Sequence, residues 1–173
     1  NYRIMNNLII KCVCVFIITL FILFSSCKKK YEVGSVIPIQ EGWAIKTSFG
    51  DSGRVDAVSF SIGKKGYLGT GYDGINSLND FWEWDQATNL WTQKTNFTGA
   101  ARWLAVGFSI GTKGYIGTGS VSGAVAGSTK DFWEWDGDTA SATYNTWIQK
   151  ADFGGTERSV AVGFSIGTKV YIG

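Results

Sequence analysis

Three arginines recur at one point of a repeated segment and could do chemistry together. Arg54, Arg102 and Arg158 each open a nearly identical run of residues. If the fold gathers them around one opening, their guanidinium groups could bind an anionic ligand. The alternative is structural, since arginines can instead satisfy backbone carbonyls between repeated units. The acidic residues near enough in sequence to neutralise some of them are Asp56, Asp152 and Glu157.

Carboxylates also recur, and paired carboxylates can perform general acid and base catalysis. An active site is usually assembled once, however, whereas a repeated group occupies the same place in every copy. The sequence therefore favours a structural role for these carboxylates, with the last of each set opening an Asx turn. The first set is Asp80, Glu83 and Asp85, and the second is Asp131, Glu134 and Asp136.

Histidine and cysteine set firm limits on the chemistry. The chain has no histidine, and its three cysteines, Cys12, Cys14 and Cys27, all precede residue 28. Residues 28–173 therefore exclude a disulfide, a thiolate nucleophile, a Cys/His zinc site and a Ser-His-Asp triad. We expect no metal and no cofactor.

Charge argues against nucleic acid as a partner. The chain has 16 basic and 14 acidic residues. Two of the basic residues, Arg3 and Lys11, lie before residue 28 in a stretch without acids, so the remainder is neutral. A nucleic-acid-binding protein normally carries a basic surface.

The repeat itself predicts β-hairpins. The run RWLAVGFSIGTKGYIGTG over residues 102–119 returns as RVDAVSFSIGKKGYLGTG from Arg54 and as RSVAVGFSIGTKVYIG from Arg158, with periods of 48 and 56 residues. Large apolar residues alternate with small ones over 105–110, which predicts a strand whose small-residue face lies in a crowded place. Residues 111–114 have turn chemistry, and 115–119 predict the returning strand.

Each repeated unit is long enough for four strands. In the second copy these are predicted at 105–110, 115–119, 131–135 and 147–150, which is the composition of one propeller blade. Trp43, Trp91 and Trp147 each lie 11 residues before an arginine of the repeat. We expect the repeated tryptophans to pack in the core or between blades.

These linked motifs resemble the kelch repeat. The glycine-rich end of the second strand, Gly117-Thr118-Gly119, stands where the family has a glycine pair. Trp84 and Trp91 flank a turn over residues 85–90 and are 7 residues apart, as in the family. The resemblance covers about residues 41–173 and implies an all-β fold of four-stranded antiparallel blades. Kelch propellers are mostly binding scaffolds and only occasionally enzymes.

The number of repeats predicts an incomplete propeller. A kelch blade needs about 50 residues, and propellers close with about 4 to 8 blades. We therefore expect residues 41–173 to form an open arc of about 2.5 blades, a fragment of a longer propeller. Apolar residues such as Phe164 and Ile166 would then lie on an open blade face and favour self-association.

The amino-terminal residues predict export and lipidation. Residues 12–24 form an uncharged apolar run of 13 that follows Lys11, which indicates a signal helix rather than a membrane span. Its end, Leu23-Phe24-Ser25-Ser26-Cys27, resembles the lipobox of bacterial lipoproteins, which implies lipidation of Cys27. Residues 1–27 are then the signal peptide and 28–40 a tether. The predicted location is the bacterial cell envelope, on the outer membrane or facing the periplasm.

Residues that break the repeat are the better candidates for ligand binding. The loop after the second strand covers 72–79 in one copy and 120–130 in the next, three residues longer. Variable loops on a rigid scaffold often carry recognition. The candidates beside the three arginines are Tyr72, Asp73, Asn76 and Trp103, the last as a stacking surface.

Three functions remain open. The first is a lipid-anchored, exported scaffold that binds a protein or glycan. The sequence favours this binding role over an enzymatic one. The second is a sugar epimerase similar to the periplasmic N-acetylneuraminate mutarotase, which could work with carboxylates and arginine alone. Galactose-oxidase-like copper chemistry would need histidine and a cysteine-linked tyrosine, which residues 28–173 lack. The third is a purely structural envelope protein.

Overall fold

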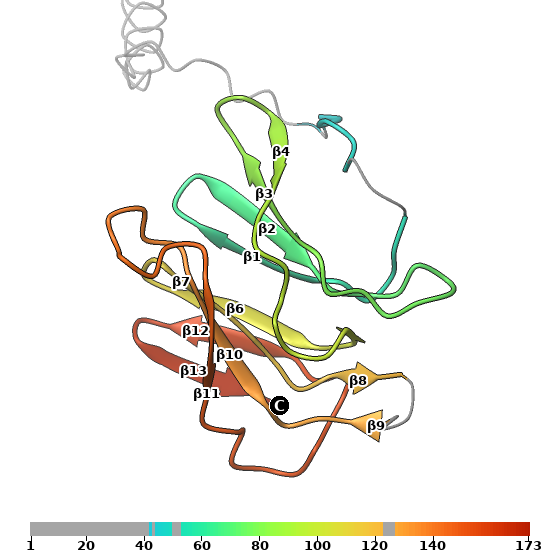
Figure 1. Ribbon diagram of the computed structural model, residues 1–173. Coiled ribbons are helices and arrows are strands. Elements are labelled where there is room, and N and C mark those ends of the chain that lie inside the picture. Colours follow the sequence, from blue (N-terminus) through green and yellow to red (C-terminus); the bar gives the residue numbers. More distant parts are fainter. Residues whose placement is uncertain (1–41, 43, 50–52, 123–126) are drawn as a thin grey trace, which may run out of the picture. The chain divides into compact units, whose positions relative to one another are not determined.

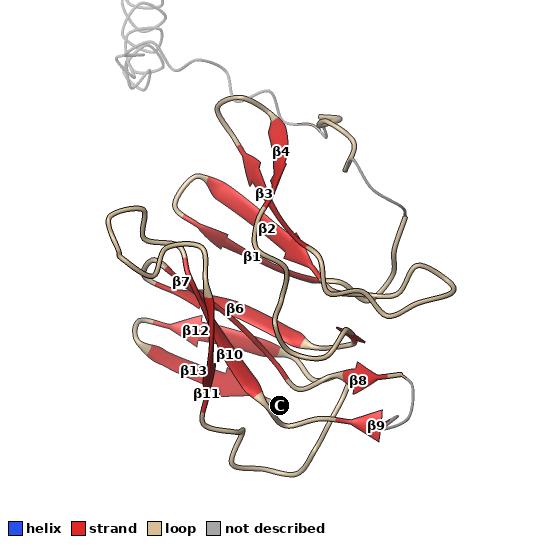
Figure 2. Cartoon of the chain, in the orientation of Figure 1, coloured by secondary structure: helices blue, strands red, loops and turns tan. Residues whose placement is uncertain are grey.

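The computed structural model describes residues 42, 44–49, 53–122 and 127–173. The predicted signal peptide (1–27), the tether (28–40), Cys27 and Trp43 lie outside the described residues. The chain divides into two compact units, Asn1–Ala44 and Ile45–Gly173, and every described strand belongs to the second unit. Figure 2 shows strands and loops but no helix in the described part. Among the described residues, no helix has the length and apolarity that a membrane span requires.

Two four-stranded antiparallel sheets confirm the predicted blades (Figure 1). In each sheet the strands are ordered as they follow in the chain. The first sheet contains β1 (Val58–Ile62), β2 (Lys65–Gly69), β3 (Phe81–Asp85) and β4 (Leu90–Gln93). The second contains β6 (Val106–Ile110), β7 (Lys113–Gly117), β10 (Phe132–Asp136) and β11 (Trp147–Lys150). The third repeat contributes a two-stranded sheet of β12 (Gly163–Ile166) and β13 (Lys169–Ile172).

The hairpin turn is shorter than predicted. Ile110 pairs with Lys113, so the turn is the two residues Gly111-Thr112, and Gly114 lies inside β7. Gly111 has a φ of 58°, and the matching Gly63 and Gly167 both have 59°. A left-handed residue at the first central position is what a type II′ hairpin requires, and glycine adopts it without steric cost.

The small-residue face of the first strand is packed as predicted. A Cβ added at Gly107 would overlap the Val58 side chain, and one added at Gly114 would overlap Phe60. Both glycines therefore let the first sheet approach the second closely. On the opposite face, Val106 and Phe108 are buried toward the third repeat.

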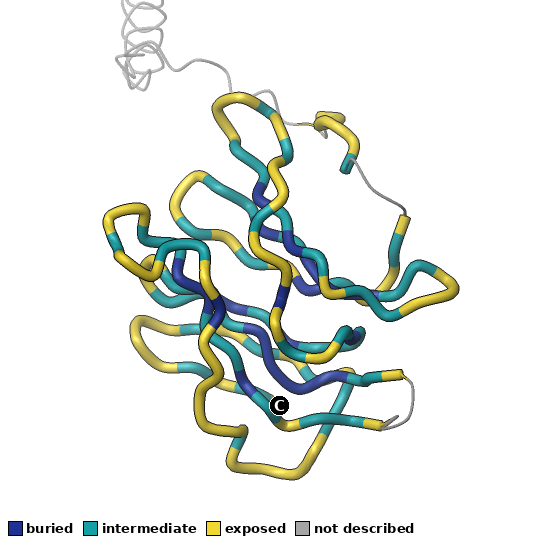
Figure 3. The backbone as a smooth tube through the Cα atoms, viewed as in Figure 1, coloured by how far each residue is buried: buried dark blue, intermediate teal, exposed yellow. Residues whose placement is uncertain are grey.

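The cores lie between neighbouring sheets (Figure 3). β1 lies beside β6, and β6 beside β12, so the first strands of the repeats are neighbours. The predicted packing role of the tryptophans is confirmed for Trp135 and Trp147, which are 0% and 8% exposed. The larger core consists of Val58, Tyr67, Phe81, Phe97, Ile116, Trp135 and Trp147, and the smaller one of Val106, Phe108 and Phe132.

A small fourth sheet forms at one end of the second blade. Its strands are β5 (Arg102–Trp103), β8 (Ser120–Val121) and β9 (Gly127–Ser128), in the order β5-β8-β9. The first copy has only isolated bridges there, which join Tyr72 to Val55 and to Ser77. The described sheets do not close a ring, and they form an incomplete propeller-like arrangement.

Candidate functional site

The Arg102 side chain is buried and has several hydrogen-bond partners. It is 1% exposed, and both terminal nitrogens donate to the Asp131 carboxylate at 2.7 Å. The guanidinium also donates to the carbonyls of Thr118 at 2.9 Å and Ala100 at 3.0 Å. This bidentate pair and the two carbonyl contacts join the chain before β5, after β7 and just before β10. The geometry of Arg102 is therefore that of the structural alternative.

Two aromatic rings complete this cluster. The Arg102 guanidinium lies 4.9 Å from the centroid of Phe97, and the Trp133 indole donates to Asp131 at 2.7 Å. Phe97 meets Trp133 edge to face at 5.7 Å. We call Phe97, Arg102, Asp131 and Trp133 the arginine clamp. Burial would raise the pKa of Asp131, but the hydrogen bonds from Arg102 and Trp133 outweigh it and lower the pKa.

The first copy repeats the clamp. Arg54 meets Asp80 at 2.5 and 2.7 Å, Trp82 donates to Asp80 at 2.7 Å, and Arg54 lies 4.7 Å from the Phe49 centroid. In the third copy, Arg158 lies 4.5 Å from the Phe153 centroid and donates to the Thr156 carbonyl at 3.3 Å.

The acids predicted from the sequence to neutralise some of the three arginines are not the ones that bind Arg54 and Arg102. Asp56, Asp152 and Glu157 are close in sequence, but the carboxylates that bind these arginines are Asp80 and Asp131, just before β3 and β10. Acids close to an arginine in sequence lie along the same stretch of chain, whereas Asp131 contacts Arg102 from a segment 29 residues away. The sequence signal that could have identified these partners is the aspartate that precedes Phe-Trp in both copies. A ligand-binding role for the three arginines stays a prediction.

The other repeated carboxylates have internal partners. Glu83 accepts hydrogen bonds from Lys65 at 2.7 Å and from Tyr67 at 2.9 Å. Burial opposes ionisation of Glu83, but these two hydrogen bonds dominate and lower its pKa. Glu134 accepts from Tyr115 at 2.8 Å, and burial together with this bond raises the pKa of Tyr115 to about 12.

The predicted Asx turns are confirmed. Asp85 accepts from the backbone N–H of Ala87 at 2.7 Å, and Asp136 accepts from that of Asp138 at 2.9 Å. Hydrogen bonds from Lys113 and then from Ser141 and Thr143 lower the pKa of Asp136 well below its usual range. These carboxylates hold turns together and are not free for acid and base catalysis.

The residues that break the repeat come together on one surface. The Tyr72 and Trp103 rings lie 5.0 Å apart at 37°, and Ser77 hydrogen-bonds Ser122 at 2.9 Å. Asp73 accepts from the backbone N–H groups of Asn76 at 2.6 Å and Ile75 at 2.8 Å, and these bonds lower its pKa. Asn76 is exposed at the tip of this turn. We call residues 72–79, Trp103, 120–122 and 127–130 the loop face.

A depression of about 450 Å³ adjoins the loop face. Besides the loop residues 127–130, its lining includes Gln149, Asp152 and Glu157, which follow from β11 toward Arg158. Sequence reasoning did not recognise Lys130, Asp152 and Glu157 as a set. Their signal was available, because the first copy has Asn79, Asn96 and Ala101 at the matching positions.

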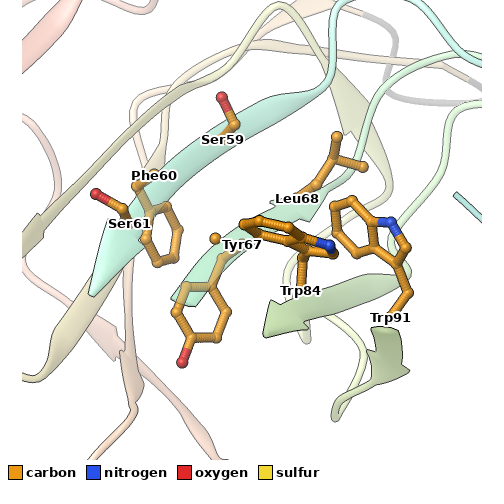
Figure 4. Close-up of a pocket in the computed structure, with 8 residues that line it drawn as sticks. Ser59, Phe60, Ser61, Tyr67, Leu68, Trp84 and Trp91 are labelled. Carbon is orange, nitrogen blue, oxygen red and sulfur yellow. The ribbon is translucent and has the colours of Figure 1, made fainter. Parts of the chain in front are cut away.

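A second depression, of about 340 Å³, lies on one face of the first sheet (Figure 4). Figure 4 shows Trp84 and Trp91 beside Leu68 in its lining. Trp84 and Trp91 occupy the positions of Trp135 and Trp147, which the second sheet buries against the first. The lining is therefore a blade-packing face by its residue types. Among the described residues no group of three or more His, Cys, Asp or Glu side chains is placed to hold a metal.

The stacked four-stranded antiparallel sheets form an incomplete propeller-like arrangement that is compatible with a kelch-like fold. Among solved structures, YjhT matches with a TM-score of 0.58 at 19% sequence identity, over 68% of this chain and 33% of YjhT. The chain thus spans about a third of the length of YjhT, and the likeness is one of fold. No family model and no curated protein matches the sequence.

Proposed function

We propose that this protein is an exported, lipid-anchored binding module that holds a glycan or a protein ligand on its loop face. The observation that carries the proposal is the contact between Tyr72 and Trp103, which joins loops that differ between the copies. Repeated polar residues are used inside the blades, whereas these loops are free to vary on a rigid scaffold. Half-buried aromatic rings provide area for stacking at little entropic cost.

The anchor rests on the sequence Leu23-Phe24-Ser25-Ser26-Cys27. A lipid-modified Cys27 would hold the blades at a membrane surface through residues 28–40. Expression with radiolabelled palmitate should label the wild type and leave the Cys27→Ser variant unlabelled and outside the membrane fraction. Equal labelling of both would refute the anchor.

Ligand screening of the full chain tests the binding role. Glycan arrays and pull-downs should yield a ligand whose affinity falls at least about tenfold in Trp103→Val, as expected for an aromatic anchor. Val55 occupies the matching position of the first copy, so this variant should melt like the wild type. Tyr72→Ser, which installs the residue of position 120, is the second variant. A ligand that both variants bind as tightly as the wild type would contradict the proposal.

A sugar epimerase of the N-acetylneuraminate mutarotase type is the second candidate. The observation in its favour is that Asp152, Glu157 and Lys130 line the same depression, since a carboxylate and an amine could act as acid and base. NMR exchange between anomers should then accelerate with wild-type chain and slow with Glu157→Gln. If neither activity nor binding is found, the results would favour a purely structural role in the envelope.

A further inference from the structure

The depression beside the loop face belongs to one junction of the repeat and not to the other. The chain passes from the fourth strand of one blade to the arginine of the next at residues 94–102 and again at 150–158. The first passage carries the neutral residues Asn96 and Ala101, and the second carries Asp152 and Glu157. The passage that lines the depression of about 450 Å³ therefore carries two acidic residues where the matching passage carries none.

These charges do not hold the fold together. The Lys130 and Asp152 side chains are each 48% exposed, and their nearest charged atoms are 4.0 Å apart. An exposed pair at this distance contributes little to stability. Glu157 is exposed, and no hydrogen bond or ion pair of its carboxylate is found among the described residues. By contrast, Asp131 at the same depression is bound by Arg102 on both oxygens.

The small sheet connects this depression to the aromatic pair. β5 carries Trp103, β8 pairs with it through Ser120, and β9 pairs with β8 and leads through Gly127–Ser128 to the depression. Neighbouring strands are about 4.8 Å apart, so the two ends of this sheet are separated by about 10 Å. A ligand that touches both must be longer than one sugar ring.

We propose that the depression is a subsite of the glycan site on the loop face, and that the site takes an uncharged oligosaccharide. This inference rests on the proposed binding function. One sugar stacks at Tyr72 and Trp103, and further sugars lie across β8 and β9. There Asp152 and Glu157 accept hydrogen bonds from hydroxyls, and Lys130 donates to ring or hydroxyl oxygens. The two carboxylates outnumber the lysine, so acidic sugars are disfavoured by repulsion.

Exchange of residues between the two junctions tests this directly. The variant Lys130→Asn, Asp152→Asn, Glu157→Ala gives the second junction the residues of the first. Calorimetric titration would use cellopentaose and chitopentaose as neutral probes and pentagalacturonate as the acidic one. The full wild-type chain should bind a neutral probe at least tenfold more tightly than the acidic probe. The triple variant should lose at least tenfold for the neutral probe and keep the wild-type melting temperature.

Two controls separate the outcomes. The converse variant, Asn96→Asp, Ala101→Glu, places the two carboxylates at the first junction and should leave affinity unchanged. If Trp103→Val abolishes binding and the triple variant does not, the binding function stands and the subsite is refuted. If the acidic probe binds best, or no neutral pentasaccharide binds, the inference is also overturned. If neither variant affects a bound probe, the loop face is not the site and both proposals fail.

Discussion

The first two copies of the repeat agree inside the blade and differ at its end. Arg54 and Asp80 form the same pair as Arg102 and Asp131, each with one tryptophan donor and one phenylalanine ring. The loops just beyond these pairs share neither length nor charge. What repeats is used to build blades, and what fails to repeat is available for recognition.

The third copy shows what the clamp contributes. Arg158 keeps its phenylalanine, and no carboxylate lies within ion-pair distance of it among the described residues. Within residues 127–173 as described, Asp131 contacts Arg102 and not Arg158, although the two arginines hold equivalent positions. Comparing the unfolding free energies of variants at the two positions measures what the ion pair with Asp131 contributes, because the backbone around the two arginines is equivalent.

The largest expected effect comes from breaking the second clamp. Arg102→Met leaves the Asp131 carboxylate, which is 23% exposed, without its buried cation, and we expect a loss of about 3 kcal/mol of unfolding free energy, the low end for breaking a buried pair. Arg158→Met is the matched control and should cost less than about 1 kcal/mol. Urea denaturation of both variants measures the difference. Equal losses at the two positions would show that the clamp is not what distinguishes them.

Acid should weaken the same clamp. The pKa of Asp131 is lowered in the folded protein, so the folded state binds its proton less readily than the unfolded chain. The resulting stability is present above the unfolded pKa, about 3.9, and is lost as pH falls through the lower folded pKa. The urea midpoint should therefore drop as the pH falls below about 4. In the double variant Arg102→Met, Asp131→Asn the drop should be shallower, and an equal slope would contradict this origin.

The smallest effect should come from a strained residue of the third copy. Val160 has a φ of 61°, and the matching Asp56 has 55°. A β-branched residue in the left-handed region is costly, whereas Asp and Asn tolerate it. Val160→Asn should raise the unfolding free energy by about 1 kcal/mol, measured by denaturation. Its control is Val162→Asn, an exposed position without a left-handed φ, which should gain nothing.

Local patterns predicted most of the blade. The alternation over 105–110 and the glycine at 111 identified β6 and its turn, because hairpins depend on neighbouring residues. β7 begins two residues before its predicted start, since the turn is only Gly111-Thr112. The glycines of Gly117-Thr118-Gly119 also have a physical reason, because a Cβ at Gly117 would overlap Phe132 and Gly119 has a φ of 97°.

The rest depended on contacts that sequence distance hides. Arg102 and Asp131 are separated in the chain by β6, β7, β8 and β9, so no local pattern pairs them. β8 and β9 exist because Ser120–Val121 pairs with both β5 and Gly127–Ser128, which a loop-length count does not reveal. The charged depression could not be predicted because Lys130, Asp152 and Glu157 line it together only in the folded chain.

Exchange of one loop would show most plainly whether recognition lies in the residues that break the repeat. Residues 72–79 would replace residues 120–130 in the full chain, with a glycan or protein found by screening as the probe. We predict an unchanged melting temperature, because Arg102 and Asp131 remain, and at least a tenfold loss of affinity. An exchanged chain that still bound its ligand like the wild type would contradict a recognition role for these residues.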